Sequence, residues 1–409
     1  MVASSLLDTI DAGRMADDLW RLVAIPSPTC RERQAAIVFA DMLRDAGADV
    51  DIDETLHDSP CVIGRLAGNR PGRTFQLAGH IDHIDVPHAP PRRDSDVISA
   101  RGAADMKNGL AGILEVVRVL HRGRCDFPGS ILVTVYGRHE APTGDSAGLL
   151  NLIERGIVGD VALVTEAPNQ GDGVVIAGKG QSVWNITLHR TGAACHELNR
   201  PPNADDLLSA ALTVAARLQW INRTLQAQPN PYELLSPESL FVGQMHYGDF
   251  YNRSPSDCRL QGTRRWFPCR TFAQVQQELQ DTLKAIDLPS GITAEADWIF
   301  VGESYEIGRE EPVVEALRQA HRTVTGKTVG FAGMSAICDS NRLVPFAKVP
   351  TVLCGFDCGT AHADCERVRL AKLREPCQIV LQTVLNYLDA ECGPVGSGAF
   401  APRQDRRPA

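Results

Sequence analysis

The chain has 409 residues, of which 44% are hydrophobic and 22% are charged, and this length and composition predict a globular protein with two domains. The formal net charge is -9 and no Lys/Arg-rich segment occurs, so we expect neither nucleic acid nor a membrane as a partner. With no signal-peptide pattern and no run of about 18 apolar residues, we expect a soluble cytoplasmic protein with reduced cysteines.

Apolar strands alternate with amphipathic helices in the first 180 residues. Segments 74–80, 131–136 and 161–165 are short apolar runs, typical of parallel strands covered on both faces. A helix between the first two is indicated by apolar residues at steps of four and three, namely Met106, Leu110, Ile113, Val117 and Leu120. The sequence therefore predicts an α/β domain, with a mostly parallel sheet and helices on both faces.

A different pattern begins near residue 180. The predicted elements are, in order, a strand at 183–189, a helix through Leu208, Leu212, Ala215 and Leu218, extended segments at 240–245 and 256–266, a helix from Phe272 to Ile286, and a strand at 292–300. This is the plan of a ferredoxin-like α+β domain. The first pattern then resumes with a helix at 311–324, a strand at 351–356 and a helix at 376–389. We expect one domain of residues 1–181 and 297–391, an inserted domain of residues 182–296, and a disordered tail of residues 392–409, which is rich in Gly and Pro.

Polar residues stand at the ends of the predicted strands, where open α/β sheets bind their ligands. Two histidines and three carboxylates at such ends and loops form a nitrogen and oxygen donor set that suits Zn, Mn or Co: His80, Asp105, Glu140, Glu166 and His362. Residues two apart on a strand point the same way, so Asp82 is expected to orient the imidazole of His80. Asp105 has two oxygens and could bridge two metal ions, which predicts one or two divalent metals per subunit.

Several of these segments together resemble a known family. The motifs "GHIDHIDVP", "ISARGAADMKNGLAG", "TEAPN" and "AHADCERV" resemble the co-catalytic zinc metallohydrolases that include carboxypeptidase G, acetylornithine deacetylase, succinyl-diaminopimelate desuccinylase and aminoacylase. The resemblance extends over nearly the whole chain. It implies that the five residues named above bind two metal ions, and that the inserted domain is a lid that also forms a homodimer.

The resemblance also implies roles for lid residues. His196, in "TGAACHELNRPPNA", matches the histidine that reaches the active site of the other subunit. Asn252 and Arg265 match the lid residues that hold a substrate carboxylate. Arg264 and Arg265 lie on opposite faces of a strand, so only one of them can point inward.

The sequence departs from the family at one catalytic position. Family members carry two consecutive glutamates, a general base followed by a metal ligand, whereas this chain has His139 and Glu140. In one interpretation His139 transfers the proton, which an imidazole can do, and Glu140 binds metal. In the other, Glu140 is the base and Ala141 stands where a ligand should be.

The sequence thus predicts a metal-dependent hydrolase that cleaves a C–N bond, an amide, in a small carboxylate-bearing substrate such as an N-acyl amino acid or a dipeptide. His196 and the metal would stabilise the oxyanion. Two alternatives remain open. One is an aminohydrolase that removes an amine from an activated aromatic acid, and the other is a catalytically silent homologue that binds a metal or ligand.

Overall fold

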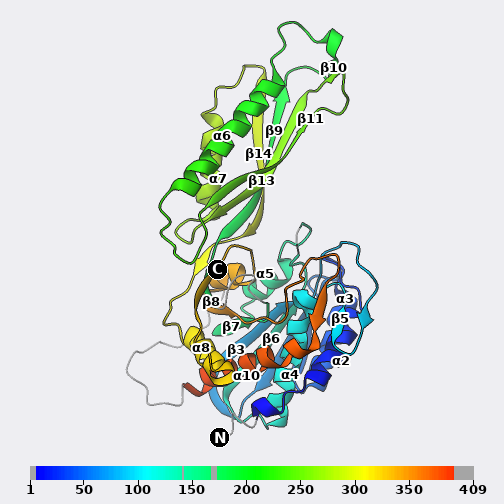
Figure 1. Ribbon diagram of the computed structural model, residues 1–409, viewed down its shortest axis with the longest axis vertical. Coiled ribbons are helices and arrows are strands. Elements are labelled where there is room, and N and C mark those ends of the chain that lie inside the picture. Colours follow the sequence, from blue (N-terminus) through cyan, green and yellow to red (C-terminus); the bar gives the residue numbers. More distant parts are fainter. Residues whose placement is uncertain (1–5, 141, 167–172, 391–409) are drawn as a thin grey trace.

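A computed structural model of the chain describes residues 6–140, 142–166 and 173–390. The molecule has a larger α/β body and a smaller antiparallel sheet, which lie at opposite ends of the long axis of the molecule (Figure 1). The predicted tail, residues 392–409, lies outside the described residues. Among the helices of the described part, none combines the length and the apolar character that a membrane crossing requires.

The larger sheet has the strand order β1-β2-β6-β3-β7-β17. Strand β3 pairs in parallel with both β6 and β7, and β17 pairs in parallel with β7. Only the β1 and β2 edge is antiparallel. The prediction of a mostly parallel sheet is therefore confirmed, and its strands are β1 (Asp49–Asp53), β2 (Cys61–Ala67), β3 (Arg70–His80), β6 (Pro128–Tyr136), β7 (Val161–Val164) and β17 (Thr351–Leu353).

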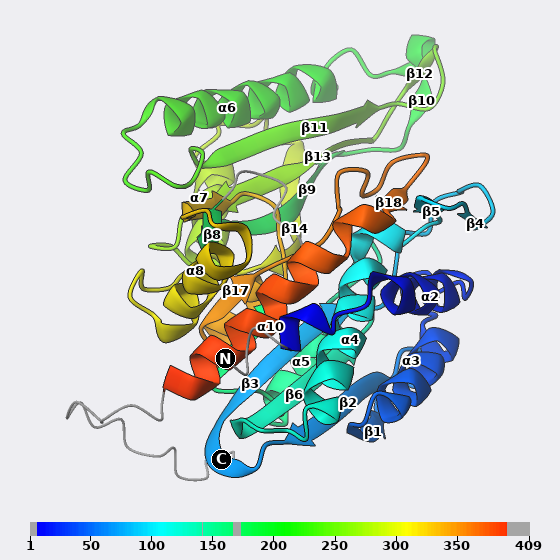
Figure 2. The same ribbon diagram turned by 60° about the horizontal axis from the view of Figure 1, so that its bottom comes forward.

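Helices cover this sheet on both faces, as Figure 2 shows for the face that carries α2, α3, α4 and α10. Their apolar side chains form the largest buried cluster with β3 and β6. A second cluster joins α5 to the opposite face. The helices are α2 (Ala12–Val23), α3 (Arg33–Asp45), α4 (Asn108–Arg122), α5 (Ala147–Glu154), α8 (Pro312–Thr325) and α10 (Arg374–Asp389).

Shorter elements complete the larger body. Two three-stranded sheets have the orders β15-β8-β16 and β18-β5-β4, and a single short helix, α9, follows β16. Their bounds are β4 (Arg92–Arg93), β5 (Val97–Ser99), β8 (Gly173–Gly178), β15 (Tyr305–Glu306), β16 (Gly330–Met334), α9 (Ser340–Arg342) and β18 (Arg367–Arg369).

The predicted start of the helix now identified as α4 is wrong by two residues. Met106 has non-helical backbone angles and lies in the turn that precedes the helix. Its sulfur accepts a hydrogen bond from the backbone N–H of His80 at 3.3 Å. Met106 therefore packs against the end of β3, which accounts for its apolar character without a place on the helix.

The smaller sheet has the strand order β11-β13-β9-β14, with all its neighbours antiparallel. Helices α6 and α7 pack on one face of it (Figure 1). The predicted ferredoxin-like order of elements is confirmed, and the bounds are β9 (Gly180–Arg190), α6 (Leu207–Ala227), β11 (Ser239–Tyr247), β13 (Asp257–Trp266), α7 (Phe272–Lys284) and β14 (Ile292–Gly302), with a two-stranded ribbon of β10 (Cys195–His196) and β12 (Arg253–Ser254) at the outer end.

Three details of this region differ from the sequence prediction. The expected boundary between residues 296 and 297 falls inside β14, and Ile286 lies beyond the end of α7. In α6 the side chains of Leu208 and Leu212 are exposed, at 39% and 53%. The buried face passes through Leu207, Ala211, Val214 and Leu218 instead, because α6 carries two overlapping apolar spacings and the packing on the sheet selects one.

Candidate metal centre

His80 is the last residue of β3, and Asp82 lies two residues beyond it. Both belong to the candidate metal centre. His80 is fully buried, and its Nδ1 lies 3.2 Å from the carbonyl oxygen of Asp82 and 3.5 Å from Asp82 Oδ1. Asp82 Oδ2 accepts hydrogen bonds from the backbone N–H groups of His139 and Glu140, both at 2.9 Å. Asp82 therefore contacts His80 through its backbone carbonyl, and its carboxylate joins the end of β3 to the loop that follows β6.

Asp105 lies between two imidazoles. Its Oδ1 is 3.2 Å from His80 Nε2, and its Oδ2 is 3.2 Å from His362 Nε2. His362 Nε2 also lies 3.0 Å from Glu140 Oε1. Burial raises the pKa of Asp105, but the hydrogen bonds from His362 and His80 outweigh it and the net shift is downward. The two oxygens of this carboxylate thus face two different histidines, as a bridging ligand would.

The loop that carries Asp105 is held by a buried carboxylate from a distant segment. Glu366 Oε1 accepts hydrogen bonds from the backbone N–H groups of Ala104 and Asp105, at 2.8 and 3.0 Å. Glu366 Oε2 accepts from Gly102 N at 3.0 Å and pairs with Arg101 at 3.2 Å. The last residue of the "AHADCE" segment is therefore a support for the site, a role that the sequence reading did not assign.

These residues fit a divalent metal ion. Ligand atoms of His80, Asp105 and Glu140 all lie within 4.8 Å of one another. Glu166, which follows β7, has a buried Oε2 with no hydrogen-bond partner among the described residues. Burial and the charge of Asp105 raise the pKa of Glu166 to about 8. Carboxylates crowded in a buried site repel one another unless a cation lies between them, and imidazole with carboxylate oxygen suits Zn, Mn or Co.

His139 lies beside this cluster and makes a different set of contacts. Its ring stacks on that of His80, with centroids 4.1 Å apart and planes 4° from parallel. Its Nδ1 is 2.9 Å from Asp339 Oδ1, and Tyr136 donates a 2.6 Å hydrogen bond to Asp339 Oδ2. Burial and the neighbouring His80 lower the pKa of His139, but Asp339 outweighs them and raises it to about 9.

The sequence reading missed Asp339, which is 200 residues from His139. Its only signal was a single acidic residue in the short segment "SAICDSN". An isolated carboxylate of this kind has no spacing that relates it to a distant histidine. Tertiary packing alone brings the two together.

The three residues that the sequence predicts in a lid make other contacts in this structure. His196 Nε2 is 3.1 Å from Asn252 Nδ2, and both belong to the β10 and β12 region at the outer end of the smaller sheet (Figure 1). Arg265 donates a hydrogen bond to the carbonyl oxygen of Ser335, whereas Arg264 is buried and paired with Glu238. Within this chain, the structure does not bring His196, Asn252 or Arg265 to the metal ligands.

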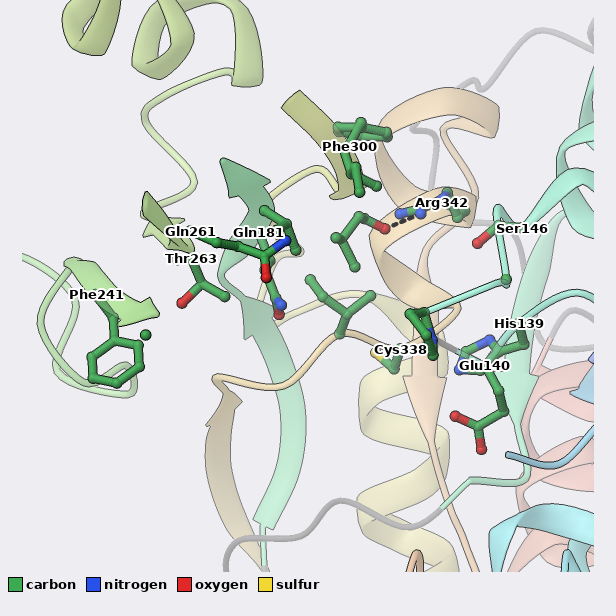
Figure 3. Close-up of a pocket in the computed structure, with 18 of the residues that line it drawn as sticks. His139, Glu140, Ser146, Gln181, Phe241, Gln261, Thr263, Phe300, Cys338 and Arg342 are labelled. Atoms are coloured by element: carbon green, nitrogen blue, oxygen red, sulfur yellow. Dashed lines mark hydrogen bonds between the residues drawn. The ribbon is translucent and has the colours of Figure 1, made fainter. Parts of the chain in front are cut away.

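A cavity of about 470 Å³ connects the metal ligands to the smaller sheet. Figure 3 shows His139 and Glu140 on one side of it, Gln181, Gln261 and Thr263 from the smaller sheet facing them, and Arg342 beside Phe300. Its walls are largely apolar, with Val183, Ile299 and Ile337 among the lining residues. The site can therefore accept a small molecule with an apolar body next to the candidate metal position.

Comparison with known proteins extends this description. A deformylase from Halalkalibacterium halodurans, described as N-formyl-4-amino-5-aminomethyl-2-methylpyrimidine deformylase, is 24% identical over 90% of this chain and 92% of its own length. Succinyl-diaminopimelate desuccinylase from Shewanella piezotolerans is 26% identical over 75% of this chain and 80% of its own. The aminopeptidase PepT structure from Bacillus cereus superimposes with a TM-score of 0.70 at 20% identity, over 92% of this chain and 99% of that one.

The family model described as peptidase family M20/M25/M40 matches residues 76–386. This range includes all five predicted metal ligands and the whole smaller sheet. It covers more than half of the chain, and the resemblance noted in the sequence is confirmed. The chain belongs to peptidase family M20/M25/M40.

Proposed function

We propose that this protein cleaves the amide bond of a small carboxylate-bearing substrate, such as an N-acyl amino acid or a dipeptide, with one or two divalent metal ions. Membership of the family already makes it a hydrolase of C–N bonds. The observation that carries the finer proposal is the meeting of His80, Asp105 and Glu140 within 4.8 Å beside an apolar cavity. Relatives named as a deformylase and a desuccinylase support an amide as the bond that is cleaved.

The proposed metal ligands are His80, Asp105, Glu140, Glu166 and His362. Asp105 would bridge two ions, because its two oxygens face different histidines. A divalent ion held there supplies Lewis-acid chemistry, since it polarises a carbonyl group and lowers the pKa of water. Asp82 keeps His80 and the backbone of Glu140 in place for this purpose.

His139 is the proposed general base. Asp339 raises the pKa of His139 to about 9, and the positive charge of a bound metal ion would lower it and favour the neutral imidazole. In the neutral form, Nδ1 donates to Asp339, and Nε2 can accept a proton from water and pass it to the leaving amine. Glu140 then acts as a ligand, which its 3.0 Å contact with His362 supports. In the other interpretation Glu140 is the base, and Ala141, which lies outside the described residues, stands where a ligand should be, so that case predicts a poorer or single-metal site.

The lid residues take part in this proposal through a second copy of the chain. His196 and Asn252 are exposed or half-buried at the outer end of the smaller sheet, and they contact each other. In a homodimer formed through the smaller sheet, this pair would reach the cavity of the other subunit. There, His196 would donate to the developing oxyanion and Asn252 would bind the substrate carboxylate. Arg265 would bind the same carboxylate after releasing its hydrogen bond to Ser335.

The proposal is tested with a panel of N-acyl amino acids, dipeptides and aminobenzoates in the presence of Mn²⁺ or Zn²⁺. We expect hydrolysis of an amide that is lost after treatment with a chelator and restored by added metal. Release of ammonia from an aminobenzoate would instead support the aminohydrolase. A protein that binds no metal, with no turnover of any compound, would support the silent homologue.

Two variants separate the roles of the adjacent residues at the end of β6. Glu140→Ala is expected to abolish turnover and to lose metal, because it removes a ligand from the cluster. His139→Ala should slow turnover by about 100- to 10,000-fold, the usual contribution of a positioned base, while the metal content stays at the wild-type value. Metal content is measured by elemental analysis, and loss of metal from His139→Ala would make His139 a ligand and contradict the assignment.

A further inference from the structure

Arg342 is a buried cation that lines the cavity beside the metal centre. It ends α9, and only 3% of its surface is exposed. Its Nη2 donates to the carbonyl oxygen of Val301, while Nε and Nη1 are buried without a hydrogen-bond partner among the described residues. Buried guanidinium groups are almost always paired, so two unsatisfied donor atoms on one of them require an explanation.

The acidic groups near Arg342 do not supply that partner. Asp339 is three residues away, but its Oδ1 faces His139 and its Oδ2 accepts from Tyr136. The described residues include no ion pair to Arg342. Burial lowers the pKa of Arg342, to about 10, which still leaves the group charged at neutral pH. Glu303 accepts hydrogen bonds from Trp266 and Phe272 instead. The guanidinium in the cavity wall thus has no carboxylate in direct contact among the described side chains.

The rest of the cavity suits a substrate with both an apolar and an acidic part. Phe300 lies against the guanidinium, with Arg342 Cζ 5.0 Å from its ring centroid. Phe241, Ile299 and Ile337 supply further apolar wall. Among the described residues that line the cavity, Arg342 is the only lysine or arginine. Figure 3 shows it on the wall next to Phe300, while His139 and Glu140 lie on the side of the metal ligands.

We propose that Arg342 binds a carboxylate of the substrate inside this cavity and selects substrates in which an apolar segment joins that carboxylate to the scissile amide. The inference rests on the proposed amide hydrolysis and adds to it a specificity residue within the same chain. It differs from the role given to Arg265, because Arg265 does not line the cavity and its guanidinium is bonded to Ser335. A carboxylate is the expected partner because its oxygens accept from several guanidinium N–H groups at once.

The test compares matched substrates with and without the acid. 4-Acetamidobutyric acid and its amide place the carboxylate on the amine side of the scissile bond, and succinanilic acid and its amide place it on the acyl side, in both cases across a chain of methylene groups. We expect the wild-type protein to prefer one acid over its matched amide by about 10- to 100-fold in kcat/KM, mainly through KM. The absence of a preference in both pairs would overturn the inference without any variant.

Variants then assign the preference to Arg342. Arg342→Gln should lower kcat/KM for the acid much more than for the matched neutral amide, so that the preference for the acid is lost. Arg342→Lys should keep part of the preference because the charge remains. Arg318 is a matched control, since it also stacks on a phenylalanine, with Cζ 4.9 Å from the ring of Phe331, but does not line the cavity. Arg318→Gln should not change the preference. An acid preference that survives in Arg342→Gln would show that the cation has a structural role only.

A binding measurement separates this inference from the proposed function. Calorimetry of the metal-loaded protein with 4-phenylbutyrate and with 4-phenylbutanol needs no turnover. We expect the acid to bind at least about tenfold more tightly than the alcohol to the wild type, with a smaller difference in Arg342→Gln. If no amide is hydrolysed but this difference appears, the proposed function fails and the binding role of Arg342 holds. Equal differences in the two proteins would overturn the role of Arg342.

Discussion

The pair formed by His139 and Asp339 gives the sharpest prediction about catalysis. Replacing Asp339 with asparagine keeps the size of the side chain but changes which atom faces the histidine. Tyr136 donates its hydroxyl proton to Asp339 Oδ2, so the amide oxygen of an asparagine is expected there. The amide nitrogen then faces His139 Nδ1 across the 2.9 Å contact and donates to it. Nδ1 becomes an acceptor, which moves the imidazole proton to Nε2.

An imidazole with its proton on Nε2 cannot accept a proton from water at that atom. The Asp339→Asn variant should therefore lose the contribution of the base, a fall of about 100- to 10,000-fold in kcat, with KM unchanged. At about 1.4 kcal/mol per factor of ten, this corresponds to about 3 to 5 kcal/mol of transition-state stabilisation. The assay is steady-state kinetics on whichever amide the panel identifies, together with the metal content of the same preparation.

Tyr136→Phe is the matched control, because it removes one hydrogen bond to Asp339 and leaves the carboxylate facing His139. We expect it to lower kcat by less than about tenfold. An Asp339→Asn variant that turns over at the wild-type rate with full metal content would refute the role of His139 as the base. A variant that loses metal instead would mean that Asp339 acts through the metal site.

Three further predictions concern the residues that support the site and the sharing of sites in a dimer. Glu366→Ala leaves three backbone N–H groups and a buried arginine without their partner. We therefore expect the free energy of unfolding, measured by denaturant titration, to fall by about 3 to 5 kcal/mol. An unchanged midpoint of the denaturant-induced unfolding would contradict this. In Gly109→Ala, the new Cβ would collide with the backbone oxygen of the residue that follows β7. That residue directly precedes the proposed ligand Glu166, so we expect weaker metal binding. Gly330→Ala meets nothing within 4 Å and should leave metal binding unchanged. Mixing inactive His196→Ala with inactive Glu140→Ala should restore some activity if dimers share their sites, and mixtures without activity would argue against a shared site.

Much of the local structure follows from short-range patterns in the chain. Apolar runs predict strands such as β3 and β6 because parallel strands are covered on both faces. The candidate metal ligands that follow these strands, His80 and Glu140, can be recognised because the carboxyl ends of parallel strands meet along one edge of the sheet. The order of elements in the smaller sheet also follows from periodicity. These features depend on residues close together in the sequence, whose relative positions are fixed by the local secondary structure.

Other features depend on which segments pack together. In α6 two apolar spacings overlap, and only the contact with the sheet shows that Leu208 and Leu212 are exposed. The supports of the site, Asp339 and Glu366, act on residues about 200 to 260 positions earlier, at distances along the chain that carry no pattern.

The sequence by itself determined the family, the fold class and the set of candidate metal ligands, because each follows from residue type and local spacing. Only the tertiary structure decided that His139 faces a carboxylate, that Glu366 holds the loop of Asp105, and that Arg342 lies in the cavity wall with two donor atoms that no described residue satisfies. The physical reason is that a hydrogen bond or an ion pair needs two groups in contact, and packing decides which groups meet and which are left without a partner.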